Sequence, residues 1–132
     1  MSYRLEKEKT KYSPYVLVDE EKGYIKLEGF CYIDNIPTFF LELNTWLEKY
    51  LSSDFSELTF ECDLQYFNSS TTKQLFNMIR LMNKNAIGKK VIVNWIVSNP
   101  KNNILIECGE DFKEDFSNLD FNIKILKEET YE

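Results

Sequence analysis

The pattern of apolar residues changes its period within one stretch of the chain, residues 58–82. In the first part every second residue is apolar, which is the alternation of a β-strand with one buried face. After Asn68 the apolar residues recur at intervals of three and four, which predicts an amphipathic helix. The apolar positions are Leu58, Phe60, Cys62, Leu64 and Tyr66 in the strand, and Leu75, Met78, Ile79, Met82 and Ala86 in the helix. A run of four hydroxyl side chains, residues 69–72, therefore lies where a strand ends and a helix begins.

Similar patterns predict the other elements of the fold. The further strands are expected at residues 15–19, 24–28, 90–97 and 121–125. A first helix is expected after Asp34 and Asn35, which offer an N-cap, and a third helix is expected after Pro100. The predicted order of elements is therefore ββαβαβαβ.

This order defines an α/β fold. Each strand–helix–strand unit should cross over in the right-handed sense and make its strands parallel, so that only the opening hairpin is antiparallel. The central strand carries Glu61 and Asp63 on the face opposite its apolar side, which indicates that helices cover mainly one side of the sheet. We therefore predict a two-layer domain with a mixed, mostly parallel five-stranded sheet and about three helices mainly on one face.

The 132 residues suffice for one domain with a substantial core. Residues 1–13 are rich in charge and are predicted to form a flexible N-terminal arm. Residues 14–127 are predicted to form a single domain, and residues 128–132 a loose C-terminus. The start of the chain has no signal-peptide pattern, and no apolar run approaches the roughly 20 residues that span a bilayer, so no membrane partner is expected.

Composition and charge argue against several functions. The formal net charge is −6 without a basic cluster, so nucleic acid is not an expected partner. The absence of histidine removes the commonest general base, and no glycine-rich phosphate loop occurs. We therefore predict neither enzymatic activity nor a cofactor or metal site. The three cysteines lie far apart and form no CxxC pair, which favours a reducing, cytoplasmic location.

Two interpretations of the hydroxyl run are open. Serine and threonine are favoured N-caps, and Thr71 with Gln74 has the spacing of a capping box. Alternatively, one hydroxyl accepts a phosphate, which would add about −1.5 to −2 charges beside free N–H groups at the positive end of a helix. The two interpretations are compatible, because Thr71 can cap the helix while Ser69 stays exposed on the loop.

Phe67 is a candidate contact residue next to this run. Strand alternation places it on the polar side, immediately before the loop, where it would be an exposed aromatic anchor for a partner. The other interpretation is that Phe67 packs under a neighbouring helix. Burying a phosphate dianion in an interface costs several kcal/mol, whereas about 1.4 kcal/mol changes an affinity tenfold, so a phosphate here would release a partner.

Several short motifs carry a resemblance that extends from about residue 12 to residue 127. They are Leu27-Glu-Gly29, Phe40 with Trp46-Leu47 and Tyr50, Leu64-Gln-Tyr-Phe-Asn-Ser-Ser-Thr71, Val93-Asn-Trp95 and Glu107-Cys-Gly-Glu110. With these motifs the chain resembles the SiaC-like regulatory phosphoproteins of bacterial biofilm and cyclic-di-GMP signalling. The family motif reads Tyr-x-Asn-Thr-Ser-Ser and is phosphorylated on its threonine, a position that Ser69 holds here. The expected partner-binding residues are Tyr66, Phe67, Asn68, Ser70, Thr71, Asp34 and Asn35.

The resemblance implies a non-enzymatic phospho-switch with three protein partners. A protein kinase phosphorylates the family member, a PP2C-type phosphatase removes the phosphate, and the unmodified form binds and activates a diguanylate cyclase. The fold of the family is similar to that of STAS domains, so a STAS-like architecture is expected. An alternative function is that of a STAS-type anti-sigma-factor antagonist controlled by serine phosphorylation.

Overall fold

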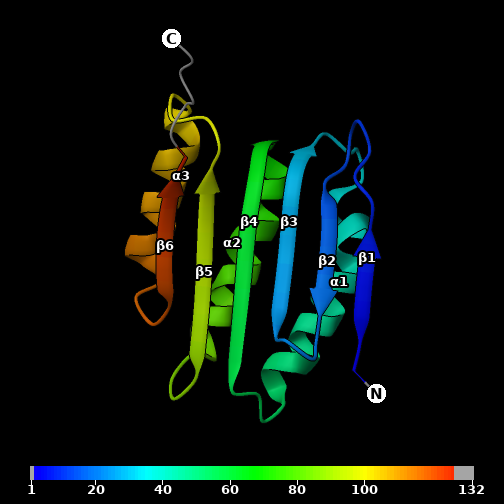
Figure 1. Ribbon diagram of the computed structural model, residues 1–132, viewed down its shortest axis with the longest axis vertical. Helices are drawn as coiled ribbons and strands as arrows, with labels where there is room; N and C mark the ends of the chain where they lie inside the picture. Colours follow the sequence, from blue (N-terminus) through cyan, green and yellow to red (C-terminus); the bar gives the residue numbers. More distant parts are fainter. Residues whose placement is uncertain (1, 127–132) are drawn as a thin grey trace.

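The computed structural model describes residues 2–126, which form six strands and three helices (Figure 1). In chain order these are β1 (Arg4–Lys7), β2 (Tyr15–Asp19), β3 (Tyr24–Cys31), α1 (Ile36–Ser52), β4 (Glu57–Phe67), α2 (Ser69–Lys84), β5 (Lys90–Val97), α3 (Asn103–Asp115) and β6 (Asp120–Ile125). No helix in this part of the chain is long and apolar enough to cross a membrane.

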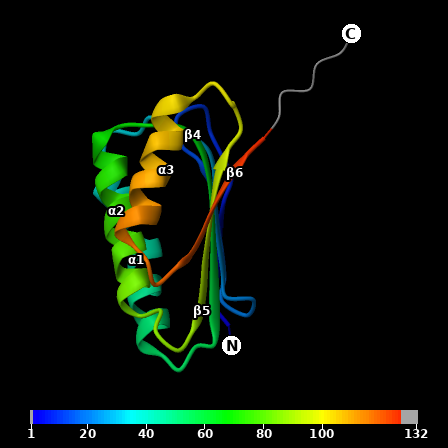
Figure 2. The same ribbon diagram turned by 90° about the vertical axis from the view of Figure 1, so that its left-hand side faces the viewer.

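The strands form one mixed sheet in the order β1-β2-β3-β4-β5-β6. The pairs β1–β2 and β2–β3 are antiparallel, whereas the pairs β3–β4, β4–β5 and β5–β6 are parallel. Figure 2 shows α1, α2 and α3 together on one side of this sheet. The prediction of a two-layer, mostly parallel α/β fold is therefore confirmed.

The predicted number of five strands is wrong by one, because part of the expected N-terminal arm forms β1. Residues Arg4–Lys7 pair with β2 as an edge strand. The ring of Tyr3, just before β1, stacks on Trp46 of α1 at a centroid distance of 6.4 Å, and its backbone N–H donates to Glu20. These tertiary contacts order a segment whose four-residue alternation is too short to stand out in the sequence. The predicted loose C-terminus, residues 128–132, lies outside the described residues.

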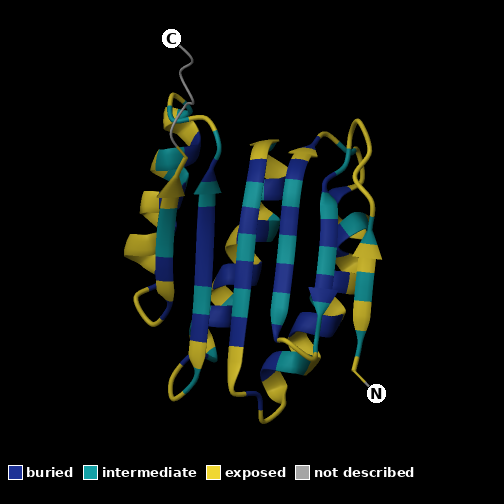
Figure 3. Ribbon diagram, in the orientation of Figure 1, coloured by how far each residue is buried: buried dark blue, intermediate teal, exposed yellow. Residues whose placement is uncertain are grey.

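The core lies between the sheet and the helices, where the predicted apolar stripes meet (Figure 3). Trp95 of β5 is the largest of the fully buried side chains, and Phe60 of β4 and Phe40 of α1 are buried as completely. Helix α3 approaches β5 closely because Gly109 faces the Trp95 indole. A methyl group at residue 109 would come within 2.5 Å of that ring. Gly109, which weakens the helix pattern in the sequence, is therefore a packing requirement.

The other face of the sheet has no helix over it and carries polar side chains among a few apolar ones. Its side chains pair across neighbouring strands: Tyr24 donates to Glu61 at 2.8 Å, and Ser98 donates to Asp63 at 2.7 Å. Burial and the hydrogen bond to Glu61 raise the pKa of Tyr24 well above its usual value. The two carboxylates of the central strand therefore belong to a hydrogen-bonded sheet surface.

The three described helices all begin at one edge of the sheet, at the carboxyl ends of β3, β4 and β5 (Figure 1). Each of them begins immediately after an asparagine, namely Asn35, Asn68 or Asn102, whose side-chain oxygen accepts a hydrogen bond from the first turn. None of these first turns contains an aspartate or glutamate. The partial positive charges of three helix N-termini therefore gather at this edge without neutralisation by first-turn carboxylates.

Candidate functional site

The hydroxyl run begins helix α2, and its N-cap is Asn68. The Asn68 side-chain oxygen accepts hydrogen bonds from the backbone N–H of Thr71 at 3.0 Å and from the Thr71 hydroxyl at 3.2 Å. The predicted capping box with Thr71 as the cap is therefore wrong. The helix begins three residues earlier than that interpretation requires, because asparagine is itself a preferred N-cap.

Burial separates the four hydroxyls into two groups. Thr71 is 0% exposed and donates to the Cys31 sulfur at 3.4 Å, while the Thr72 hydroxyl donates to the Asn68 carbonyl at 3.1 Å. Ser69 and Ser70 are exposed at the tip of the helix. Thr71 was predicted to contact a partner, but it is sealed in the core and cannot do so. Ser69 and Ser70 are the two exposed hydroxyls of the run, whereas Thr72 is half-buried in the lining of a cavity beside Ser69.

The buried contact between Thr71 and Cys31 joins the start of α2 to the end of β3. Burial raises the pKa of the Cys31 thiol, and the hydrogen bond from Thr71 only partly opposes this effect. Cys31 is therefore a protonated, unreactive thiol near neutral pH. Its role here is to fix the helix tip relative to the sheet.

A β-bulge reverses the predicted orientations of Tyr66 and Phe67. Gly29 pairs with Leu64 whereas Phe30 pairs with Tyr66, so that Gln65 is an extra residue in β4. One extra residue turns the following side chains to opposite faces. Tyr66 is consequently 46% exposed, while Phe67 packs edge-on against the buried Trp95 at a centroid distance of 6.1 Å. Of the two interpretations of Phe67, packing under a helix is correct, and Tyr66 is the exposed aromatic residue.

The bulge builds an aromatic stack on the surface, formed by Phe30, Tyr32 and Tyr66. The Tyr32 ring stacks on Tyr66 at 4.5 Å and on Phe30 at 5.8 Å between ring centroids. All three rings are exposed by 41–46%. Phe30 faces outward by the regular alternation of β3, and Tyr32 follows the end of that strand. The bulge in β4 brings Tyr66 to the same side as these two rings.

Two adjoining cavities lie beside the aromatic stack, and we call them together the Ser69 groove. The first has a volume of about 410 Å³ and is lined by residues that include Tyr66, Ser69 and Asn102. The second, of about 400 Å³, shares Gln65, Asn102 and Leu105 with the first and reaches Phe30. Within residues 2–126, no charged side chain lines either cavity.

Asp34 and Asn35, also predicted to contact a partner, lie at the same edge of the sheet, where α1 begins. Both are exposed, and the Asn35 side-chain oxygen accepts a weak hydrogen bond from the Thr38 backbone N–H at 3.4 Å. Neither residue lines the Ser69 groove. They are connected to it through Tyr32, two residues before Asp34, which stacks on Tyr66.

Comparison with known proteins agrees with this fold. The sequence profile described as "SiaC family regulatory phosphoprotein" matches residues 7–126. The chain belongs to the SiaC family. This membership confirms the resemblance and the prediction of a regulatory protein rather than an enzyme.

Relatives of this SiaC-family chain are known from Pseudomonas aeruginosa. A solved structure of SiaC is 23% identical, covers 94% of this chain and 98% of its own, and superposes with a TM-score of 0.80. A second structure, of the diguanylate cyclase SiaD with its activator SiaC, matches with 24% identity, 92% and 97% coverage and a TM-score of 0.81. An uncharacterized protein of strain UCBPP-PA14 is 26% identical over 109 residues, which are 82% of this chain and 86% of that protein.

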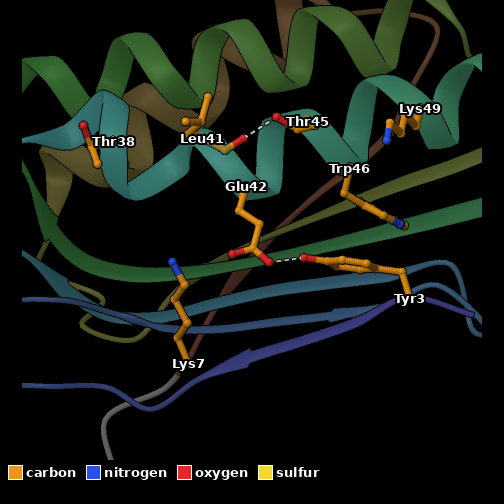
Figure 4. Close-up of a pocket in the computed structure, with 8 residues that line it drawn as sticks. All are labelled: Tyr3, Lys7, Thr38, Leu41, Glu42, Thr45, Trp46 and Lys49. Carbon is orange, nitrogen blue, oxygen red and sulfur yellow. Dashed lines mark hydrogen bonds between the residues drawn. The ribbon is translucent and has the colours of Figure 1, made fainter.

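Another cavity of this SiaC-family chain, of about 510 Å³, lies between α1 and the segment around β1 (Figure 4). Its lining includes Tyr3, Leu41 and Trp46. The Tyr3 hydroxyl donates to Glu42, and burial together with this hydrogen bond raises the pKa of Tyr3 to about 12. None of the predicted site residues lines this cavity, so the Ser69 groove remains the candidate site.

Replacing Asn68 by alanine should lower the free energy of unfolding by about 1 kcal/mol, because the Thr71 N–H and hydroxyl lose their common acceptor. Asn68→Asp is the matched control, since it keeps an acceptor oxygen and adds a favourable charge at the helix N-terminus. It should be as stable as the natural protein in urea denaturation. If aspartate were as damaging as alanine, Asn68 would not act as a cap through its oxygen.

Proposed function

We propose that this chain is a non-enzymatic phospho-switch adaptor whose phosphoacceptor is Ser69. The observation that carries the proposal is the position of this serine: it is exposed, it is the first residue of α2, and it lines an uncharged groove beside an aromatic stack. Ser70 is also exposed but does not line the groove. A phosphate on Ser69 would therefore be the one charged group in the lining of that groove.

The helix tip supports a phosphate on Ser69 once it is formed. The backbone N–H groups of the first turn of an α-helix lack partners within the helix, and the helix dipole favours negative charge there. No first-turn carboxylate competes in α2. A serine at this position is therefore compatible with modification, and the modified form should stay folded.

The same phosphate would oppose the docking of a partner. An interface that covered the Ser69 groove would have to bury a dianion without a basic side chain in the lining, at a cost of several kcal/mol. Because about 1.4 kcal/mol corresponds to a tenfold change in affinity, this cost suffices to release a partner. Binding by the unmodified form and release after phosphorylation is the direction of control that this geometry supports.

We propose a diguanylate cyclase as the effector, activated by the unmodified protein. The support is that SiaC of Pseudomonas aeruginosa, which has the same fold, is the activator of the diguanylate cyclase SiaD. A protein kinase and a PP2C-type phosphatase would set the phosphorylation state. We also propose a cytoplasmic location, which agrees with the free thiols of Cys31, Cys62 and Cys108.

The test compares Ser69→Ala, Ser69→Asp and the matched control Ser70→Ala. Each variant is incubated with a diguanylate cyclase and a kinase of the same organism, and phosphate is located by mass spectrometry. Ser69→Ala should bind and activate the cyclase but resist phosphorylation, whereas Ser69→Asp should bind about tenfold more weakly or worse. Ser70→Ala should behave as the natural protein.

Two results would contradict parts of this proposal. Phosphate on Ser70 in the natural protein would show that the acceptor assignment is wrong. Capture of an anti-sigma factor by the unmodified protein, together with no effect on cyclase activity, would show that the effector assignment is wrong.

A further inference from the structure

The Ser69 groove and the aromatic stack form a continuous surface with the features of a docking site. The groove runs from Phe30 at one end to Ser69 at the other, and Tyr66 belongs both to its lining and to the stack. Ile104 of α3, which is 83% exposed, stands at the same rim. An exposed apolar surface around a hollow of this kind is typical of protein-binding sites.

Lysines surround this uncharged surface. Lys73 lies one turn into α2 from Ser69, and Lys101 immediately precedes Asn102 of the groove. On the other side, the aliphatic chain of Lys9 lies beside Gly29, and Lys11 sits over the ring of Tyr12. The backbone carbonyl of Tyr12 accepts a hydrogen bond from the Tyr32 backbone N–H at 2.7 Å. This bond places the loop that carries Lys11 and Tyr12 next to the aromatic stack.

Carboxylates also lie at this edge of the sheet. In the described loops and helix starts around the groove they are Glu8 and Asp34, and Glu107 lies one turn into α3 as Lys73 does in α2. The loops at the opposite edge carry both signs of charge: Glu20, Glu21, Asp54 and Glu57 lie there together with Lys22, Lys89 and Lys90. Four lysines thus lie around the Ser69 groove in a chain whose net charge is −6.

We infer that the Ser69 groove and the aromatic stack bind an acidic amphipathic segment of a partner protein. Its apolar side chains would fill the uncharged groove and cover the stack, and its carboxylates would face Lys73, Lys101 and the lysines near Tyr12. This inference deepens the proposed function, because it names the chemistry of the partner surface at the same site. Phosphate on Ser69 would then repel the carboxylates of that partner as well as charge the groove.

The test needs neither the kinase nor the cyclase. A random peptide library displayed on phage is selected on the immobilised full chain, and the enriched peptides are synthesised and titrated. We expect the enriched peptides to carry aspartate or glutamate around large apolar residues. Neutral or basic peptides, or no enrichment over an empty surface, would overturn the inference.

Variants then locate the binding site of these peptides. The double variant Lys73→Glu/Lys101→Glu should weaken peptide binding about tenfold or more, because it reverses two rim charges. The matched control Lys84→Glu/Lys113→Glu changes the same net charge near the far ends of α2 and α3 and should stay within about twofold of the natural chain. Equal losses in both variants would overturn the inference.

Variants of the aromatic stack give a second, independent test of the docking site. Tyr32→Ala/Tyr66→Ala removes two exposed rings and should also weaken binding about tenfold or more, with circular dichroism showing that the variant is folded. Undiminished binding by this folded variant would overturn the inference. Ser69→Asp separates the two proposals: if it binds the peptides as well as the natural chain does, the docking site stands while the phospho-switch fails.

Discussion

Replacing Trp95 by alanine should lower the free energy of unfolding by about 3–5 kcal/mol, the range typical of a large aromatic side chain removed from a core. Trp95 is 1% exposed, and its ring lies within 5.4 Å of Phe112 and 6.3 Å of Phe121 between centroids. Its indole N–H also donates to the Leu105 carbonyl of α3 at 2.9 Å. The loss should appear as a lower midpoint in urea denaturation followed by circular dichroism.

Trp95→Phe is the matched control for this prediction. It keeps most of the apolar volume but removes the hydrogen bond to Leu105, whose net contribution is about 0.5–1.5 kcal/mol. It should therefore cost clearly less than Trp95→Ala. A loss below about 1 kcal/mol for the alanine variant would mean that β5 and α3 do not meet around this side chain.

Replacing Gly109 by alanine should lower the free energy of unfolding by about 1–3 kcal/mol, the usual cost of overpacking a core. A loss of stability is unusual for this substitution, because alanine is favoured over glycine by about 1 kcal/mol inside a helix. The added methyl group would lie 2.5 Å from a carbon of the Trp95 ring, and that ring is fixed on several sides. The same urea denaturation measures this loss.

A double-mutant cycle identifies the cause of that loss. In the Trp95→Ala background the steric conflict is gone, so Gly109→Ala should raise stability by up to about 1 kcal/mol through helix propensity alone. Glu110→Ala, an exposed change on the same helix, should stay within about 0.5 kcal/mol in either background. If Gly109→Ala destabilised both backgrounds equally, contact with Trp95 would not explain the glycine.

The long elements were predictable because their periods are long and regular. The alternation of β4 up to Leu64 and the stripe of α2 placed the strand–helix junction near the hydroxyl run, but Ser69 is the first residue of α2 and does not lie on a loop before it. The stripe of α2 is buried as predicted, from Leu75 to Met82. Local periodicity is a sufficient signal wherever an element buries one face over several turns or residue pairs.

The sequence could not reveal what depends on contacts between distant segments. Strand β1 is ordered by β2 and by contacts with α1 that no local pattern announces. The bulge at Gln65 exchanges the faces of Tyr66 and Phe67. Because both residues are aromatic, the sequence pattern is the same whichever of them faces the core. The cap at Asn68 had a usable signal, since Asn35 and Asn102 stand at the same place before their helices.

The hydrogen bond from Thr71 to Cys31 has a consequence for the response time of the proposed switch. It ties the tip of α2 to the sheet, and Asn68 closes the same turn, so Ser69 sits on a support with little freedom to rearrange. A phosphate added there would change the charge of a fixed surface without refolding a loop. The response time of such a switch would then be set by the turnover of the enzymes that add and remove the phosphate.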